Sequence, residues 1–191
     1  MNNLICLLRT FYMPQFHDFM FNYPKLGIFY LGGKIEGCNI EIHDVVFVIG
    51  KSNIDMSQQI KNKWIGTPVS LHIDSWFIAD SIDGFNIHIH ETKPTASENY
   101  LFFVNLGSYK NNSFGEYHFM TLVVAQSRSE AIEKAREKAP KNEEMQHSDN
   151  IHDIDECIRI SEVSNYYIAL EYTGIKKESS IVNGYQKLKN H

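Results

Sequence analysis

The chain has 191 residues, 43% of them hydrophobic, which is enough for one large domain or two small ones with a shared core. Its formal net charge of -5 argues against a nucleic-acid-binding protein, because such proteins carry a basic excess clustered on one face. The three cysteines form no C-x-x-C pair, so neither a disulfide framework nor a zinc ribbon is indicated, and we expect a cytoplasmic setting.

The N-terminal segment, residues 1–24, precedes the first predicted structural unit. Its apolar run at residues 4–8 is far shorter than the roughly 20 residues that span a bilayer. The run is also shorter than the apolar part of a signal peptide, about 7 to 15 residues. We therefore expect no membrane association. Residues 1–24 are either a packed extension rich in Phe and Tyr or sequence upstream of a start at Met20.

The next segment, residues 25–91, is predicted to have the order β-β-α-β-β. Residues 26–31 and 41–49 are apolar runs typical of strands. Ser52, with Asp55 three residues later, predicts the N-terminus of a helix. An apolar stripe at helical spacing, which should face the sheet, consists of Met56, Ile60 and Trp64.

After this helix, residues 71–81 and 85–90 are expected to form a hairpin, because Asp83-Gly84 favours a two-residue type I′ turn. Alternation along these strands predicts one apolar and one polar face. The apolar face consists of Trp76, Ile78, Ile82, Phe85, Ile87 and Ile89. The polar face consists of Ser75, Ser81, Asn86, His88 and His90.

The second half of the sequence repeats the first. Residues 31–52 align without a gap with residues 106–127, and residues 72–89 align with residues 153–170. The repeated helix signal is Ser127 with Glu130, and its stripe consists of Ala131, Ala135 and Ala139. The duplication predicts an α+β fold in which two tandem β-β-α-β-β repeats pack as a pseudo-symmetric unit with a largely antiparallel sheet.

The repeats set the predicted domain boundaries. The first repeat covers residues 25–91, a linker covers residues 92–99, and the second repeat covers residues 100–175. The polar stretch at residues 141–149 is interpreted as an insertion in the second repeat, and residues 176–191 as a loosely held tail.

Four segments of the first repeat indicate a family. These are LGG at residues 31–33, CNIEIHDVVFVIG at 38–50, LHIDSW at 71–76 and DGFNI at 83–87. Together they resemble the bacterial family catalogued as domain of unknown function 1543. The resemblance implies tandem copies of which the second has diverged, and it implies no activity.

The candidate site of the first repeat consists of Glu41, His43, His72 and Asp74. Because side chains alternate along a strand, Glu41 and His43 share one face, as do His72 and Asp74. If the two strands are neighbours and the two faces coincide, these groups converge and could hold a divalent metal. They could also act as an acid-base pair in which Asp74 or Asp44 orients a histidine. The alternative is that they are ordinary polar groups bonded to neighbouring backbone.

Other candidate groups carry weaker signals. The second repeat keeps Glu116 and His118 but has Asp153 in place of His72, so we expect any active site in the first repeat. The pair His88 and His90 could ligate a metal at the surface, although solvent-facing strand histidines are more ordinary. Among the cysteines, Cys38 is the best candidate for a reactive thiol, but no base is identified beside it, so an ordinary buried or partly exposed cysteine is the preferred interpretation.

Two functional hypotheses follow. The first is a noncatalytic cytoplasmic protein whose duplicated domain binds a partner protein or a small ligand at the junction of the repeats. The alternative is a small hydrolase, either metal-dependent or based on a His/Asp acid-base pair, with its site in the first repeat. Neither hypothesis involves nucleic acid or a membrane, and the sequence leaves the oligomeric state open, a homo-oligomer included.

Overall fold

The computed structural model describes residues 16, 19–95, 97–109, 112–140 and 153–188. Every strand pairing in this described part is antiparallel, and only two α-helices accompany the strands. The chain therefore has an α+β fold with antiparallel sheets, as the sequence predicts. Neither helix of the described part is long and apolar enough to cross a membrane.

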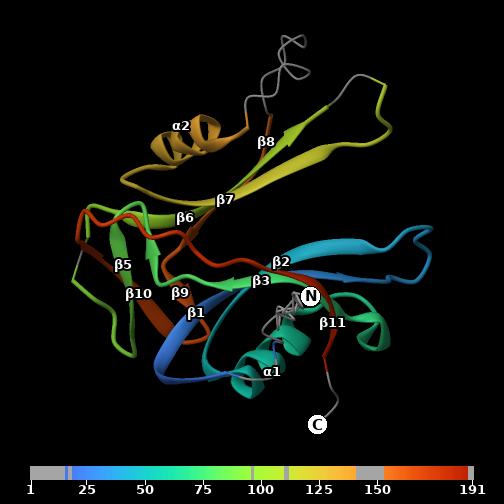
Figure 1. The fold of residues 1–191 in the computed structure, drawn as a ribbon, viewed down its shortest axis with the longest axis horizontal. Helices are drawn as coiled ribbons and strands as arrows, with labels where there is room; N and C mark the ends of the chain where they lie inside the picture. Colours follow the sequence, from blue (N-terminus) through green and yellow to red (C-terminus); the bar gives the residue numbers. More distant parts are fainter. Residues whose placement is uncertain (1–15, 17–18, 96, 110–111, 141–152, 189–191) are drawn as a thin grey trace, which may run out of the picture.

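The first sheet is built mainly from residues 20–78. Its strands lie in the order β11-β3-β1-β2, so β1 is flanked by both β2 and β3. The helix α1 follows β2 directly, and a short 3-10 turn precedes β3 (Figure 1). The bounds are β1 Met20–Gly33, β2 Ile42–Ser52, α1 Asn53–Lys63, η1 Pro68–Ser70, β3 His72–Ile78 and β11 Val182–Lys187.

Two further sheets complete the fold. One has the order β7-β6-β8 and carries α2. The other has the order β4-β5-β10-β9 and joins residues from both halves of the chain, because β5 pairs with β10. The bounds are β4 Ser81–Ile82, β5 Phe85–His90, β6 Tyr100–Ser108, β7 Tyr117–Ala125, α2 Arg128–Lys138, β8 Asp153–Ile160, β9 Glu162–Val163 and β10 Tyr166–Tyr172.

Both helices begin where the sequence predicts. The Ser52 hydroxyl accepts a hydrogen bond from the Asp55 amide at 3.2 Å, and Ser127 accepts one from the Glu130 amide at the same distance. In a capping box, the acidic side chain would accept a hydrogen bond from the backbone amide of the capping serine. Here the Asp55 carboxylate in α1 accepts one from the Lys51 amide instead, and the Glu130 carboxylate in α2 accepts one from the Gln126 amide. The predicted apolar stripes of both helices are buried.

The sheets and helices form four layers. The sheet of β1, β2 and β3 faces the sheet of β6, β7 and β8, while α1 and α2 cover the outer faces (Figure 1). A central core fills the space between the sheets and extends to β5 and β10. It includes Leu26, Ile28, Ile49, Ile87, Leu101, Phe103, Leu122, Val124 and Ile168. Because both halves contribute to this core, we expect them to fold together.

The predicted hairpin of residues 71–81 and 85–90 is only partly present. The turn is type I′, with φ of 52° at Asp83 and 83° at Gly84, as expected. However, β3 pairs with β1 rather than with β5, and only the two-residue strand β4 completes the hairpin. The expectation fails because β5 finds a longer partner in β10 of the second half. The chain therefore passes from one sheet to another between β3 and β4.

This change of sheet also corrects the predicted faces. Trp76 lies in the core beneath α1, whereas Ile87 lies in the central core, so they do not share one face. Ser81, expected on the polar face, is buried. The alternation of side chains between two faces holds only within one continuous strand. Because β3 ends at Ile78 and β4 begins at Ser81, the faces of β3 do not predict those of β4 and β5.

The ends of the chain pack more than the sequence suggests. Strand β1 begins at Met20, inside the predicted extension, and Phe16 is fully buried against Phe29 and Trp76. In the predicted tail, β11 pairs with β3, so the expectation of a loosely held segment is wrong for Val182–Lys187. The predicted insertion at residues 141–149 lies outside the described residues.

Replacing Asp83 with alanine should destabilise the protein by about 2 kcal/mol. The Asp83 carboxylate accepts hydrogen bonds from the Val124 amide and from Lys138, and its left-handed backbone disfavours alanine. Urea denaturation measures the change. The control is Ser164→Ala in the other type I′ turn, where only one side-chain bond, to Gln59, is lost. Equal losses in both variants would contradict this role of Asp83.

Candidate metal centre

Four polar side chains gather on the inner face of the first sheet. Glu41 directly precedes β2, His43 belongs to β2, and His72 and Asp74 belong to β3. The structure brings these four residues together. The expectation that their strands are neighbours is wrong, because β1 lies between them. The side chains therefore have to meet above β1.

They meet above Gly32. This residue of β1 pairs with His43 on one side and with His72 on the other. A Cβ atom at Gly32 would collide with the His72 Nε2 atom and would lie 2.7 Å from Asp74 Oδ2. Only glycine leaves this space open, and it therefore allows side chains from two separated strands to converge.

A β-bulge aims Asp74 into the same space. Tyr30 pairs with Ser75 and Leu31 pairs with Ile73, which leaves Asp74 as the extra residue on β3. Bulges re-aim side chains and are frequent beside functional sites. Here the bulge turns the Asp74 carboxylate toward both imidazoles.

The four side chains form a ring of alternating imidazoles and carboxylates. The His43 Nε2 atom lies 3.6 Å from Glu41 Oε1 and 3.4 Å from Asp74 Oδ2. The His72 Nε2 atom lies 3.8 Å from Glu41 Oε2 and 3.4 Å from Asp74 Oδ1. Each carboxylate thus offers one oxygen to each histidine. All four contacts exceed the 2.7–3.2 Å typical of an N–H···O hydrogen bond.

His72 is the most buried member of the ring, with a side chain only 4% exposed. Its Nδ1 atom lies 2.9 Å from the Ser70 carbonyl oxygen, which can only accept, so Nδ1 carries a proton. Its Nε2 atom faces the carboxylates of Glu41 and Asp74, which a metal cation between these groups would neutralise. A histidine that donates one N–H to a backbone carbonyl and keeps the other nitrogen free is typical of metal ligands.

An aromatic ring fixes each imidazole. Tyr30 stacks on His43 with ring centroids 5.1 Å apart and an interplanar angle of 8°. Tyr185 of β11 lies against His72 with centroids 4.3 Å apart. Burial and the nearby Asp74 carboxylate raise the pKa of Tyr30, so its phenol stays protonated and can donate a hydrogen bond.

The other predicted candidates lie elsewhere. Asp44 is exposed on the opposite side of β2, where its carboxylate accepts a hydrogen bond from the Val45 amide, so it does not orient a ring histidine. Cys38 is exposed. His88 is paired with Glu171 of β10 at 2.9 Å.

A second cluster lies on the inner face of the other large sheet. It consists of Glu116, His118 and Asp155, and one ligand atom from each lies within 4.8 Å of the others. The three side chains are exposed. Asp155 lies at a bulge of β8, and Gly107 of β6 pairs with His118. The sequence alignment retained Glu116 and His118 and paired Asp74 with Asp155, but the replacement of His72 by Asp153 led us to expect any site in the first repeat.

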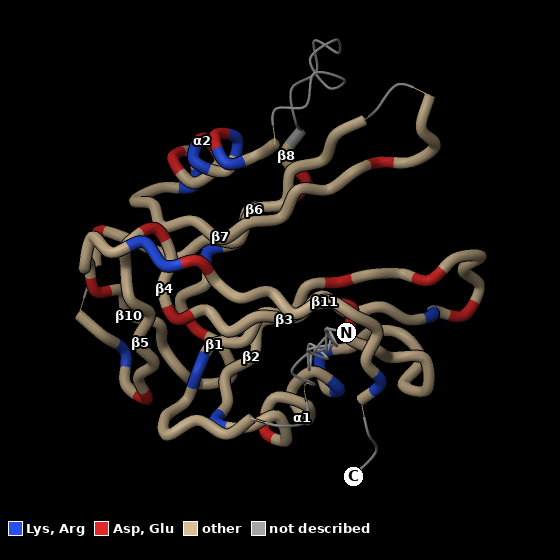
Figure 2. Tube along the Cα trace, viewed as in Figure 1, with Lys and Arg blue, Asp and Glu red and all other residues tan. Residues whose placement is uncertain are grey.

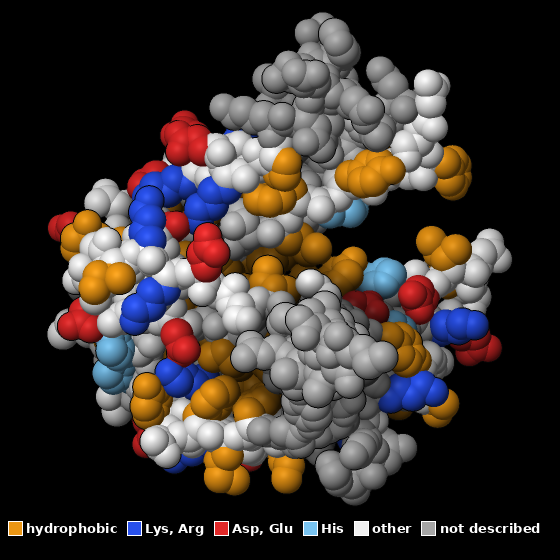
Figure 3. All heavy atoms as spheres, in the orientation of Figure 1, with side chains coloured by type: hydrophobic (Ala, Val, Ile, Leu, Met, Phe, Trp, Pro, Cys, Tyr) orange, Lys and Arg blue, Asp and Glu red, His pale blue; other side chains and the backbone are white. Residues whose placement is uncertain are grey.

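The two clusters flank an open cleft between the sheets. Figure 3 shows histidine side chains on both walls of the mouth, with apolar side chains deeper inside, and Figure 2 shows acidic residues on both walls. A cavity of about 440 Å³ lies in this cleft. Its walls come from both halves and include Ile28, Tyr30, Val45, Asp74, Phe77, Phe103, Met120 and Leu122. Asp74 therefore belongs to the ring and to the cavity wall.

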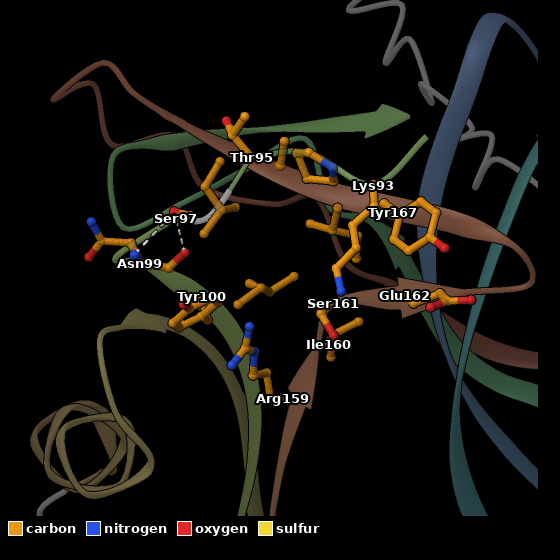
Figure 4. Close-up of a pocket in the computed structure, with 15 residues that line it drawn as sticks. Lys93, Thr95, Ser97, Asn99, Tyr100, Arg159, Ile160, Ser161, Glu162 and Tyr167 are labelled. Atoms are coloured by element: carbon orange, nitrogen blue, oxygen red, sulfur yellow. Dashed lines mark hydrogen bonds between the residues drawn. The ribbon is translucent and has the colours of Figure 1, made fainter. Parts of the chain in front are cut away.

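Another pocket, of about 530 Å³, lies between the linker, β6, β8 and β10. Lys93 and Arg159 extend into it (Figure 4), and the Arg159 guanidinium lies 3.3 Å from the centre of the Tyr100 ring. Glu162 also lines this pocket. None of the ring residues does, so this pocket is separate from the candidate metal centre.

The fold and site define an α+β protein with two facing antiparallel sheets and a His/carboxylate ring in its cleft. Residues 38–89 match the family described as Domain of Unknown Function (DUF1543), in agreement with the resemblance seen in the sequence. This match covers the first half alone, so it does not support a second copy. A comparison with curated proteins gave no match.

A solved structure extends this relationship over most of the chain. The crystal structure of protein Il1583 from Idiomarina loihiensis is similar, with a TM-score of 0.68 and 35% sequence identity. The alignment covers 87% of this chain and 99% of that one. The chain therefore belongs to the same family as Il1583, and its residues 38–89 are the part that matches the DUF1543 description.

Proposed function

We propose that this protein is a noncatalytic binding protein that holds a divalent transition-metal ion in the ring of Glu41, His43, His72 and Asp74. The metal serves to capture a small ligand in the cleft between the two halves. The observation that carries the proposal is the Asp74 Oδ2 atom, which is buried without a hydrogen-bond partner in a ring where the Nε2 atoms of His43 and His72 face both carboxylates.

The donor set suits such an ion. Two imidazole nitrogens and two carboxylate oxygens are ligands of zinc and of neighbouring divalent metals. Ligand atoms around a tetrahedral zinc ion at about 2.0–2.1 Å lie about 3.3 Å apart. The four ring contacts of 3.4–3.8 Å involve both oxygens of each carboxylate, so the side chains would have to rotate as well as approach one another to close around an ion. The ion would also neutralise the two carboxylates.

The proposed metal would remain accessible from the cleft. The Glu41 and His43 side chains are 45% and 36% exposed, whereas His72 is shielded. Zinc and similar ions can add a fifth ligand beside four protein atoms. A group entering from the cleft would take that position, which favours ligand capture over a purely structural metal.

The proposal includes a duplicated architecture. The element order β-β-α-β-β-β occurs in residues 20–90 and again in residues 100–172. In the pairing of β5 with β10, His88 lies opposite Ala169, and the isoleucines on either side of His88 lie opposite the neighbours of Ala169. Ile87 pairs with Leu170, and Ile89 pairs with Ile168. Such reciprocal pairing is expected of related units packed about a twofold axis. A groove along this axis would then separate the halves.

A small metal-dependent hydrolase is the second candidate. The observation that favours it is the protonated Tyr30 phenol beside Asp74, because a hydrogen-bond donor next to a metal can stabilise a developing oxyanion. Turnover of nitrophenyl esters by the zinc-loaded protein, lost in Tyr30→Phe, would support it over simple binding.

The test is zinc binding by the purified protein, measured by elemental mass spectrometry and competition with a chromophoric chelator. We expect one tightly bound zinc ion at the ring, lost in the His43→Ala/His72→Ala variant because two of four ligands are removed. His43→Ala alone, at a half-exposed position, should also weaken binding strongly and avoids a cavity at the buried His72.

The matched control is the His88→Ala/His90→Ala variant, which removes two histidines from another sheet. It should bind zinc like the unmodified protein. His118→Ala separates the second cluster from the ring, since it should leave the tight site unchanged. Equal losses in the ring variant and the His88/His90 control would contradict the proposal.

A further inference from the structure

We infer that the cleft takes a small monocarboxylate with an apolar tail, whose head group binds the ring metal while the tail lies between the sheets. The inference rests on the proposed metal centre. It adds the chemical class of the ligand, which follows from the cavity that opens beside Asp74.

The cavity wall is mainly apolar and comes from both halves. Ile28, Val45 and Phe77 belong to the first sheet, while Phe103 and Met120 belong to the second. A volume of about 440 Å³ lies within the range of small-molecule sites. Burial of a hydrocarbon tail here would displace water from apolar surface.

Two polar side chains of the cavity wall, Asp74 and Tyr30, lie at the ring, where a head group would end. The wall also includes Ser75, Thr121 and Asn183. The Tyr30 phenol lies on this wall and can donate a hydrogen bond to a carboxylate oxygen. A head group bound to the metal would thus find a second partner within the same wall.

The charge of the site selects a monoanion. None of the residues that line this cavity is Lys or Arg. A divalent ion balances Glu41 and Asp74, so a bound dianionic phosphate would leave two negative charges without a basic partner. A carboxylate adds only one, which the Tyr30 hydrogen bond and the metal can stabilise.

Calorimetry with butanoate, hexanoate and octanoate tests the inference on the zinc-loaded and the zinc-free protein. We expect the affinity of the zinc-loaded protein to rise about three- to fourfold for each added CH₂. Octanoate should bind at least about tenfold more weakly to the zinc-free protein, because its head group loses the metal. Octan-1-ol, which lacks the carboxylate, should show no such dependence on zinc.

A wall variant and a surface control locate the site. Met120→Gln in β7 should weaken octanoate binding about tenfold without changing zinc affinity, because its side chain lines the cavity and is not part of the ring. Ile158 is 40% exposed and does not line the cavity. The Ile158→Gln variant should therefore keep both its octanoate affinity and its zinc affinity.

The two proposals fail in different ways. A protein that binds zinc but shows no chain-length dependence, or no effect of Met120→Gln, overturns the ligand class alone. A protein that binds no zinc overturns the metal centre and with it the proposed head-group contact.

Discussion

Zinc affinity should fall by about 100-fold or more in the Gly32→Ala variant while the protein stays folded. The added Cβ would occupy the space of His72 Nε2 and would lie 2.7 Å from Asp74 Oδ2, so two of the four ligands must move. Loss of groups that only orient metal ligands costs 10- to 100-fold in affinity, and displaced ligands should cost at least as much. Competition with a chromophoric chelator gives the affinity, and far-UV circular dichroism reports the fold.

The matched control for this variant is Gly107→Ala. Gly107 lies beneath the second cluster, where a Cβ would collide with Glu116 Oε1 and lie 2.8 Å from both Asp155 carboxylate oxygens. The change in backbone freedom is the same in both variants, but only Gly32→Ala disturbs the ring. The prediction is contradicted if both variants retain full zinc affinity, or if both lose it equally.

Replacing Leu101 with alanine should destabilise the whole protein by about 2–5 kcal/mol. Leu101 is 1% exposed in the central core, to which both halves contribute. Both tryptophans, Trp64 and Trp76, lie in the first half. If the halves unfold together, this substitution in the second half should lower the unfolding midpoint seen by tryptophan fluorescence.

Ile158→Ala serves as the control, because this side chain is 40% exposed and should cost little. Far-UV circular dichroism follows both halves at once. We expect the unfolding transitions followed by fluorescence and by circular dichroism to coincide. In Leu101→Ala, both should have a lower midpoint. An unchanged fluorescence midpoint in that variant would mean that the halves unfold independently, against a shared core.

Local sequence signals predicted the helices and turns well. Ser52 and Ser127 cap their helices because a short hydroxyl side chain can reach the free amides of the first turn. Asp83 and Gly84 form the type I′ turn because both tolerate positive φ. These features depend on residues close together in the chain, so the sequence alone is enough.

Long-range pairing was harder to predict. Strand β5 pairs with β10 and β11 pairs with β3, with 75 or more residues between the paired strands in each case. Local propensity carries no information about such pairing. The polar composition of residues 176–191 favoured a loose tail. Backbone pairing along the edge of β3 overrides that preference.

The candidate site could be predicted from the sequence only in part. Period-two alternation placed Glu41 with His43 and His72 with Asp74, and the structure brings the two pairs together. That they meet above Gly32 depends on strand order and on the bulge at Asp74, neither of which alternation reveals. In the second half the alignment named Glu116, His118 and Asp155 as equivalents, but their convergence likewise depends on a bulge, at Asp155.

X-ray absorption spectroscopy of the zinc-loaded protein tests the metal centre most directly. We predict a first shell of nitrogen and oxygen atoms at about 2.0–2.1 Å, with outer-shell scattering from two imidazoles. The scattering should fall to that of one imidazole in His43→Ala and stay unchanged in His88→Ala. A protein that binds no zinc, or zinc whose shell contains no imidazole, would contradict the account.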